Sequence, residues 1–442
     1  MKHLNTLFAI AAVIATAACT KVEMDDLAVP ERKIAFEVAS YVPQTKAGHS
    51  LITELSGLDV ATSDQVFKSK AFIHADNGSG STANPVPFFN AGVSGVETIS
   101  FNDANDEWAP AHTYYWPKAV RSNIDFFSWY DMAGTDPTIT FTTPFSSISM
   151  QWANRSVSLK DNVMWADGAW HFKNNDGDIH DHDGVTKGVP TLFHHALAQV
   201  RFSVMQNPMK QADAKNSGKY TFWEVKLNGV SIAASSVHSN GTLTLSESDP
   251  GTASTVQTWT KPEYDVWANA ASPAYATLDG TTVFNTNLAK GVDGSSNPVY
   301  LTGSEQYLTV ATNMPDNYFT VRPQAIADGV TLTFTYTIHT WYGTEEQYAA
   351  ANHAGCTDMG TETVNVNDLG PTVSGATYGA PYTDTGIQLN DITGAWGYWQ
   401  MNKKYTYKLV INPATEQILY DPAVEDWADD VNASRTVPQP AA

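Results

Sequence analysis

The stretch TLTFTYTIHTWY at residues 331 to 342 decides the fold class of this chain. Its apolar side chains alternate with threonines, a period of two that is typical of an extended strand with one face in a core and the other in water. The apolar positions are Leu332, Phe334, Tyr336 and Ile338, and the polar positions are Thr331, Thr333, Thr335 and Thr337. The pattern predicts a long β-strand.

Similar alternation recurs along the chain. The further runs are IAFEVASYV (34 to 42), IDFFSWY (124 to 130), YTFWEVKL (220 to 227), NYFTVRP (317 to 323) and YTYKLVIN (405 to 412). The segments between them are rich in Gly, Asn, Asp, Ser and Pro, which favour turns and surface loops. Sustained helical periodicity is nearly absent. We therefore predict an all-β protein of antiparallel sheets packed as sandwiches.

The composition agrees with a globular, strand-rich protein and excludes one class of partner. The 442 residues are 42% hydrophobic and only 16% charged, which is too apolar for a disordered chain. This length suffices for two or three domains, and two is the favoured number. The formal net charge of −21 would repel nucleic-acid phosphates, so we expect no nucleic acid as a partner.

Residues 1 to 18 have the pattern of a bacterial signal peptide. A short basic start is followed by an apolar run shorter than the about 20 residues that span a bilayer. Ala17, Ala18 and Cys19 resemble a lipobox, in which the cysteine is lipidated, and residues 19 to 33 would then form a lipid-anchored linker. The alternative is an ordinary signal peptide with an unmodified cysteine. Once Cys19 is acylated, Cys356 has no second thiol, so we expect no disulfide.

Two adjacent histidines stand in TLFHHALAQVRFSV at residues 191 to 204. If this stretch is one strand, the side chains of His194 and His195 point to opposite faces and cannot converge on one metal ion or one substrate. His194, on the apolar face with Leu192 and Ala196, is predicted to be a core histidine with a hydrogen-bond partner. His195 is predicted to be exposed or half-exposed. A ligand or general-base role for His194 is the alternative.

Two further groups of residues, one acidic and one aromatic, are compatible with ligand binding. The stretch NNDGDIHDHDG at 174 to 184 has the composition of a cation-binding loop, but it lacks the oxygen spacing and closing glutamate of an EF-hand, so a solvated acidic loop is favoured. A group of aromatic residues could form a platform for stacking sugars, although aromatics at strand spacing more often belong to a core. The group is Trp341, Tyr342, Trp396, Tyr398 and Trp399.

The sequence contains no nucleophile elbow, phosphate-binding loop or zincin motif. Paired carboxylates for glycoside hydrolysis depend on a distance in space, which the sequence does not contain. We therefore expect that the protein is not an enzyme, and we predict no catalytic residue, no cofactor and no metal site.

Several stretches occur in an order that is typical of one family. They are WPKAVRSNIDFFSWY (116 to 130), DNVMWADG (161 to 168), VPTLFHHALAQVRFSV (189 to 204), NYFTVRPQ (317 to 324), WGYWQMNKKYTYKLVINPATEQILY (396 to 420) and VEDW (424 to 427). In this order, and behind a lipoprotein signal, they resemble the fimbrillin family, the pilins and accessory subunits of bacterial type V pili.

The resemblance implies a structural subunit of fimbriae that serves adhesion, on the outer surface of the cell outer membrane. It implies two tandem transthyretin-like β-sandwich domains, which we place at 34–210 and 211–427, and a C-terminal tail at 428–442. The implied partners are other fimbrillin subunits in a head-to-tail polymer, the outer membrane through the lipid anchor, and surface ligands of host or bacterial cells.

The segment RKIAFEVASYVPQTKAG at 32 to 48 is the candidate joint between subunits. Its alternating Ile34, Phe36 and Val38 predict a strand that completes the sheet of the first domain. The resemblance implies that a trypsin-like protease removes this strand after export. The candidate processing site is Lys46 and Ala47, where the family usually has arginine, so a strictly arginine-specific protease would not cleave there.

The resemblance further implies that a terminal segment of a neighbouring subunit fills the groove by strand addition. The candidate donor is the tail after Trp427, ADDVNASRTVPQPAA, in which Val431, Ala433 and Val437 could face a groove. Proline cannot donate a ladder hydrogen bond, so only the part before Pro438 should pair well. The alternative function is a monomeric, lipid-anchored glycan-binding protein or adhesin, and a third is an extracellular hydrolase.

Overall fold

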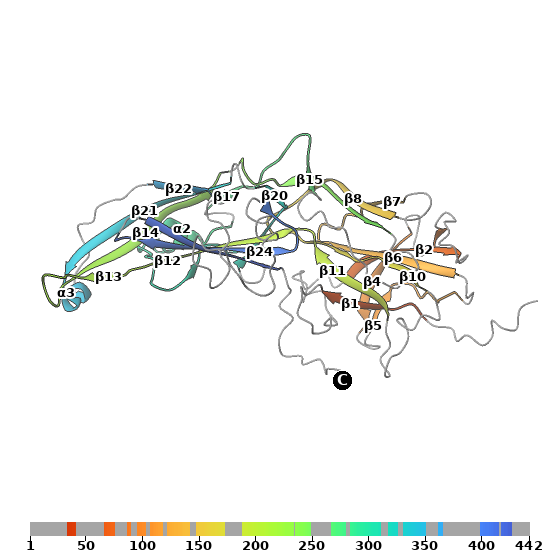
Figure 1. The fold of residues 1–442 in the computed structure, drawn as a ribbon, viewed down its shortest axis with the longest axis horizontal. Helices are drawn as coiled ribbons and strands as arrows, with labels where there is room; N and C mark the ends of the chain where they lie inside the picture. Colours follow the sequence, from red (N-terminus) through yellow and green to blue (C-terminus); the bar gives the residue numbers. More distant parts are fainter. Residues whose placement is uncertain are drawn as a thin grey trace, which may run out of the picture.

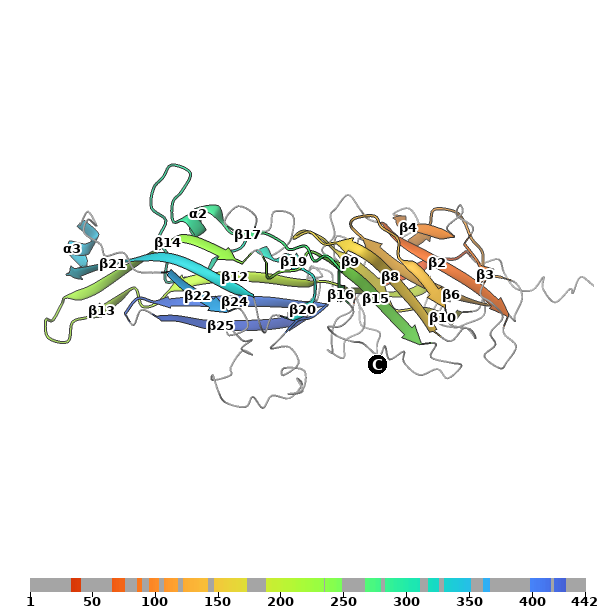
Figure 2. The same ribbon diagram turned by 90° about the horizontal axis from the view of Figure 1, so that it is seen from above.

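The computed structural model describes most of the chain between residues 33 and 426. The described ranges are 33–40, 66–75, 86–89, 95–102, 107–117, 122–141, 147–172, 188–233, 235–248, 267–279, 283–310, 317–325, 330–350, 361–365, 398–414 and 417–426. In these ranges the chain is all-β, as predicted, apart from the short helices α2 (Thr286–Lys290) and α3 (Glu345–Ala350). Two groups of strands follow one another along the long axis of the molecule (Figures 1 and 2).

The first group is built on a nine-stranded sheet that closes on itself. Its order is β10 (Ala169–Phe172), β6 (Ser122–Asp131), β9 (Val163–Ala166), β11 (Val189–His195), β1 (Phe36–Ser40), β5 (Glu107–Pro110), β4 (Val96–Asn102), β2 (Val66–Ala75) and β3 (Val86–Pro87). Since β2 also pairs with β6, the strands β6, β9, β11, β1, β5, β4 and β2 form a closed circuit, here called the strand ring. Aromatic residues fill it, among them Phe36, Phe67, Trp108, Phe126 and Phe193.

A four-stranded sheet lies beside the strand ring and shares a second hydrophobic cluster with it. The sheet order is β16 (Trp267–Asn269), β15 (Asn240–Ser248), β8 (Ser147–Ser156) and β7 (Thr138–Phe141). Trp129 of β6 and Trp165 of β9 belong to the same cluster as Leu243 and Leu245 of β15. The outward faces of these ring strands are therefore buried as well.

The second group contains two five-stranded sheets. One has the order β18 (Gln306–Tyr307), β12 (Ala198–Gln206), β24 (Lys403–Asn412) and β25 (Gln417–Asp426), with β19 (Phe319–Val321) also paired to β12. The other has the order β13 (Lys210–Ala212), β14 (Tyr220–Ile232), β21 (Thr331–Gly343) and β22 (Thr361–Asn365), with β17 (Leu278–Asp279) also paired to β14. Side chains of both sheets form one hydrophobic cluster. The short strands β20 (Gln324–Ala325) and β23 (Tyr398–Trp399) pair separately.

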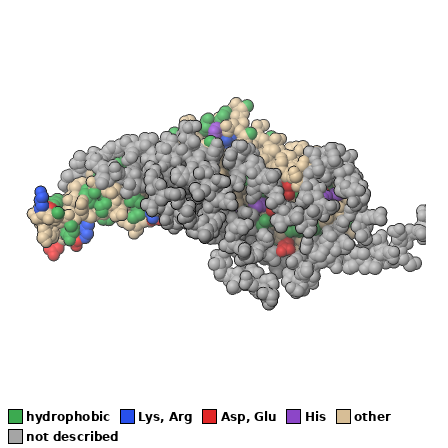
Figure 3. All heavy atoms as spheres, in the orientation of Figure 1, with side chains coloured by type: hydrophobic (Ala, Val, Ile, Leu, Met, Phe, Trp, Pro, Cys, Tyr) green, Lys and Arg blue, Asp and Glu red, His purple; other side chains and the backbone are tan. Residues whose placement is uncertain are grey.

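The strand predicted from TLTFTYTIHTWY is β21. Leu332, Tyr336 and Ile338 are buried in the second group, as the alternation predicts. Thr337 departs from the pattern, because it is buried on the opposite face and accepts a hydrogen bond of 2.8 Å from the side-chain amide of Asn228. At the end of the molecule where α3 and β13 lie, Figure 3 shows charged side chains of both signs.

Strand pairing crosses the predicted domain boundary near residue 210 in both directions. β12 precedes that position, yet it pairs with β24, β18 and β19 of the second group. β15 follows it, yet it pairs with β8 beside the strand ring. Two pairs, β1 with β11 and β12 with β24, also depart from the expected antiparallel arrangement. Parallel neighbours need long connections, and both pairs join segments far apart in the sequence.

Candidate assembly site

β1 lies in the middle of the strand ring, between β11 and β5. It runs parallel to β11, with Phe36 opposite Val189 and Ser40 opposite Phe193. On its other side Phe36 is opposite Trp108 of β5, antiparallel. Backbone hydrogen bonds extend the contact, since the N–H of Val189 donates to the carbonyl of Ala35 at 2.7 Å. β1 is therefore the strand through which the ring closes between β11 and β5.

The apolar face predicted for residues 34 to 38 is confirmed. Ile34, Phe36 and Val38 are at most 3% exposed and belong to the core of the strand ring. The ring of Phe36 meets those of Phe67 and Phe126 edge to face, with centroids 5.7 and 5.8 Å apart. Such aromatic contacts add to the hydrophobic gain from burial.

Gly188, just before β11, allows the backbone of β1 to come close. A Cβ atom at this position would lie 2.5 Å from the backbone nitrogen and carbonyl carbon of Phe36. This is far inside van der Waals contact, and the obstructing atoms are backbone, which cannot rotate away. A side chain at residue 188 is therefore incompatible with the observed place of β1.

Replacing Gly188 by alanine is expected to lower the free energy of unfolding by about 1–3 kcal/mol, the usual cost of forced overpacking. Urea unfolding followed by circular dichroism measures the change. The matched control is Gly294→Ala, because a Cβ there would meet no atom within 4 Å. Equal destabilisation by the two substitutions would contradict the close approach of β1.

Removal of β1 would leave a groove with two strand edges. Backbone groups of β11 and β5 would lose their partners, and unpaired strand edges are templates for another strand. Between these edges the side chains of Phe67 and Phe126, now 1% exposed, would lose the cover of Phe36. Such a groove can accept an extended segment with apolar residues at alternate positions.

The site residues predicted for processing and exchange lie outside the described residues. They are Cys19, Lys46, Ala47, Val431, Ala433 and Val437. The acidic loop 174–184 and Cys356 also lie outside them. The last described strand, β25, ends at Asp426, and in the described part of the chain its only strand neighbour is β24.

The structural role predicted for His194 is confirmed. Its side chain is 2% exposed, and its Nε2 atom lies 2.8 Å from Oδ1 of Asp167. The imidazole stacks on the indole of Trp165, with centroids 4.5 Å apart and planes at 20°. The partner and the stacking together account for a polar ring in the core.

The predicted exposure of His195 is wrong, because the residue is only 2% exposed. Its Nδ1 atom lies 3.0 Å from Oδ1 of Asn162, and its backbone N–H donates to the side-chain oxygen of Asn402 at 3.4 Å. The stretch 191–204 is also two strands, since β11 ends at His195 and β12 begins at Ala198. The face expected to meet water is covered by other segments.

The core placement favoured for the aromatic group is confirmed for Trp399. Trp399 is completely buried, and its indole N–H donates to the hydroxyl of Tyr407 at 3.0 Å. Trp341 packs instead against Phe222 and Tyr348, with centroids 5.7 and 5.6 Å apart. Trp396 and the side chain of Tyr398 lie outside what the structure describes, whereas Tyr342 is 46% exposed.

A buried charge cluster joins the four-stranded sheet to the strand ring, and the sequence offers no local signal for it. Nη2 of Arg155 lies 3.0 Å from Oδ1 of Asp131 and 2.7 Å from Oδ2 of Asp161. One guanidinium is shared by two carboxylates whose side chains are at most 6% exposed. Burial raises the pKa of Asp161 to about 6, although Arg155 opposes the rise, and burial also raises the pKa of Asp131.

The raised pKa of Asp161 predicts a pH-dependent stability. The carboxyl group of Asp161 binds its proton more tightly in the folded state than in the unfolded state. Protonation of Asp161 therefore adds to the free energy of unfolding, fully below about pH 4, and this stabilisation is lost as the pH rises through about 6. Asp161→Asn, which imitates the protonated acid, should therefore change stability little at pH 4 and raise it by on the order of 2 kcal/mol at pH 7.5.

Urea unfolding of both proteins at several pH values measures this difference. Asp136→Asn is the control, since the Asp136 side chain is 42% exposed and pairs with Lys68. A difference between wild type and Asp161→Asn that is constant from pH 4 to 7.5 would contradict the prediction.

Comparisons with known proteins found similarity only among solved structures. No family model and no curated protein matches the chain. It is similar to the solved structure of a fimbrial protein from Bacteroides vulgatus, at 12% identity and a TM-score of 0.47, with 90% of this chain and 100% of that chain covered. It is also similar to the tip fimbrial protein Mfa3 from Porphyromonas gingivalis, solved with a C-terminal truncation, at 10% identity and a TM-score of 0.30, with 90% and 100% covered. Likeness at these values assigns no function to the chain.

Among the described residues, no helix has the length and apolar character needed to cross a membrane.

Proposed function

We propose that this chain is a structural subunit of cell-surface fimbriae, assembled by proteolysis-triggered strand exchange and serving adhesion. The observation that supports this proposal best is the place of β1, which closes the strand ring and belongs to the N-terminal end of the chain. Cleavage after Lys46 would separate β1 covalently from the rest of the protein. The groove between β11 and β5 would then be available to a neighbouring subunit.

The proposed donor is the tail 428–442. Its part before Pro438 has about ten residues, which span some 33 Å when extended, at about 3.3 Å per residue. β1 occupies Phe36–Ser40, so the tail is long enough to replace it. The tail follows β25, which is an edge strand among the described residues. A subunit that gives its tail and accepts another would form head-to-tail polymers.

The proposal extends to export and to domain organisation. Residues 1–18 would be a signal peptide, and lipidated Cys19 would hold the precursor on the outer membrane, where two or more acyl chains anchor a protein firmly. We propose two tandem transthyretin-like β-sandwich units, at 34–210 and 211–427. Separate hydrophobic clusters in the two groups of strands support this division, with β12 and β15 crossing it. The proposal gives no residue a catalytic role.

Limited trypsin digestion tests the assembly. Trypsin should cut after Lys46 and leave a product that begins at Ala47, which N-terminal sequencing identifies. On an unheated denaturing gel we expect ladders of oligomers from this product and none from the full-length chain. Cuts after Arg32 or Lys33 should give no ladder, because they leave β1 attached.

Two variants make the test specific. Lys46→Gln should block both the cut and the ladders, and a chain lacking residues 432–442 should be cut without forming ladders. Oligomers from the uncut chain, or ladders that persist in the tail deletion, would refute the strand-exchange proposal.

A monomeric glycan-binding protein or adhesin is the second candidate function. It is favoured by an open hollow of about 450 Å³ whose lining combines polar and apolar residues, namely Asn285, Asn287, Gln306, Asn317, Tyr307, Leu288, Val299 and Val310. Cavities of this size with a few polar groups are suited to small ligands. Binding of soluble oligosaccharides by the uncleaved monomer, lost in Tyr307→Ala, would favour this candidate over a purely structural subunit.

A further inference from the structure

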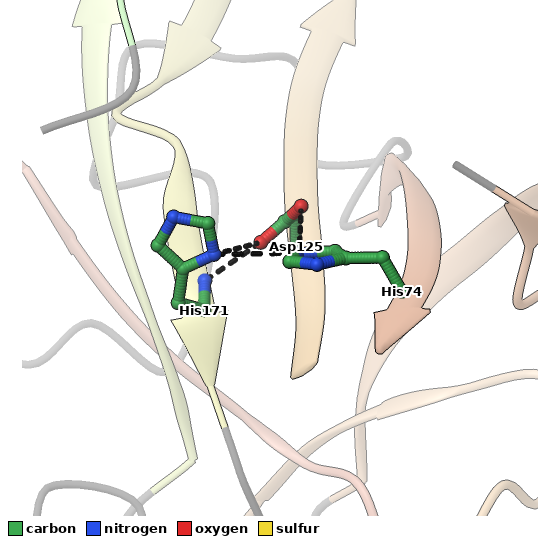
Figure 4. Close-up of side chains that lie close together, drawn as sticks. All are labelled: His74, Asp125 and His171. Atoms are coloured by element: carbon green, nitrogen blue, oxygen red, sulfur yellow. Dashed lines mark hydrogen bonds and ion pairs between the residues drawn. The ribbon is translucent and has the colours of Figure 1, made fainter. Parts of the chain in front are cut away.

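Three side chains that are typical metal ligands meet at one end of the strand ring. His74 lies near the end of β2, Asp125 lies in the neighbouring strand β6, and His171 lies in β10 at the edge of the same sheet. Figure 4 shows both imidazoles turned toward the carboxylate. Their potential ligand atoms all lie within 4.8 Å of one another. We propose that His74, Asp125 and His171 form a binding site for Zn²⁺, independent of any role in fimbriae.

The distances from Nδ1 of His171 to its two neighbouring donor atoms agree with a tetrahedral ion. Nδ1 of His171 lies 3.3 Å from Nε2 of His74 and 3.5 Å from Oδ1 of Asp125. Zinc bonds of about 2.0–2.1 Å at tetrahedral angles separate two ligand atoms by about 3.3–3.4 Å. Nε2 of His74 lies 2.9 Å from the other carboxylate oxygen of Asp125, Oδ2. Each imidazole thus faces a different oxygen, and zinc binding requires the carboxylate to turn or to bind through both oxygens.

Burial makes a cation favourable at this position. The side chain of Asp125 is completely buried and that of His74 is 6% exposed. A buried carboxylate is costly unless positive charge or hydrogen bonds compensate it. His171 is 19% exposed, so an ion can enter from its side without unfolding of the strand ring.

The backbone at His171 is held in an unusual conformation that directs its side chain. Its φ angle is +63°, in the left-handed region that residues other than glycine seldom adopt. The pairing of β10 with β6 is irregular between Ala169 and Phe172, so His171 lies in a bulge. Bulges redirect side chains, and here the backbone N–H of His171 also donates to Oδ1 of Asp125 at 2.6 Å.

The donor set favours zinc over calcium or magnesium. Two imidazoles and one carboxylate are suited to borderline ions such as Zn²⁺, whereas Ca²⁺ and Mg²⁺ prefer oxygen ligands alone. Three protein ligands leave one tetrahedral position for water. The bound ion would join the edge strand β10 to β2 and β6, and we therefore assign it a stabilising role.

Zinc titration of the purified chain, prepared without a histidine tag and stripped with a chelator, tests the site. Calorimetry with ZnCl₂ should give one tight ion per chain, and zinc should raise the Tm because it binds only the folded state. Cobalt(II) in its place should show the intense visible absorption of a tetrahedral site. Binding should weaken on acidification, because protons compete for the imidazoles.

His171→Asn is the decisive variant, because asparagine tolerates the left-handed conformation while removing the imidazole. We expect at least tenfold weaker zinc binding, loss of the cobalt spectrum, and no increase in Tm when zinc is added. His171→Gly should behave alike, since glycine also accepts this backbone conformation.

The matched control is the double variant His180→Ala and His182→Ala, in the histidine- and aspartate-rich stretch 174–184. It should retain the zinc site. Zinc binding and a Tm increase that persist in His171→Asn, or that disappear only in the control, would overturn the proposal. A chain that binds no zinc would overturn it as well and would reduce the cluster to a hydrogen-bonded His–Asp–His group.

Discussion

Replacing Phe36 by alanine is expected to lower the free energy of unfolding by about 3–5 kcal/mol, the usual cost of truncating a buried phenylalanine. Phe36 is 3% exposed and its ring contacts Phe67 and Phe126 inside the strand ring. Truncation would leave a cavity between these rings, because strands held in a closed circuit have little freedom to collapse. Urea unfolding followed by tryptophan fluorescence measures the loss.

Val86→Ala is the control for this substitution. Val86 lies in the short strand β3 of the same sheet and is 58% exposed, so its truncation should change stability by less than about 0.5 kcal/mol. A small effect of Phe36→Ala would mean that β1 contributes little to the core of the strand ring.

The same substitution bears on assembly. Displacement of β1 requires loss of its contacts, so a weaker β1 should leave the groove faster once Lys46 is cleaved. Trypsin-treated Phe36→Ala is therefore expected to form ladders sooner than treated wild type. If assembly does not use strand exchange, Phe36→Ala should still lower stability but no ladders should form. The experiment therefore separates the role of Phe36 in the core from the proposal of strand exchange.

Replacing Arg155 by alanine is expected to lower the free energy of unfolding by about 3–5 kcal/mol at pH 8, because two buried carboxylates would lose their shared cation. Asp131 and Asp161 both contact its guanidinium. The loss should be smaller at pH 5, since the pKa of Asp161 is already about 6 and protonation removes the uncompensated charge.

Lys408→Ala is the control for this charge deletion. Lys408 forms a 3.5 Å ion pair with Glu305, and both side chains are about one third exposed, so the pair is screened by water. We expect a loss of about 0–1 kcal/mol at either pH. An Arg155→Ala effect that equals this value, or that grows on acidification, would contradict the proposed charge balance.

The sequence alone determined where the long strands lie and one face that each of them buries. Alternation in β21 and in residues 34 to 38 predicted which side chains enter a core, and Leu332, Ile338 and Phe36 do so. This information is local, because a strand turns its side chains to opposite faces whatever its neighbours are. The same reasoning identified His194 as a core residue.

Only the tertiary structure decided which strands are neighbours and whether a second face is covered. His195 was expected in water, but it is buried because segments around Asn162 and Asn402 lie on it. An acid inside the apolar run IDFFSWY is a visible signal, yet nothing local pairs Asp125 with His74 and His171. Long-range strand pairing places β1 in the strand ring and brings His74, Asp125 and His171 together. A two-residue period in the sequence does not encode such pairing.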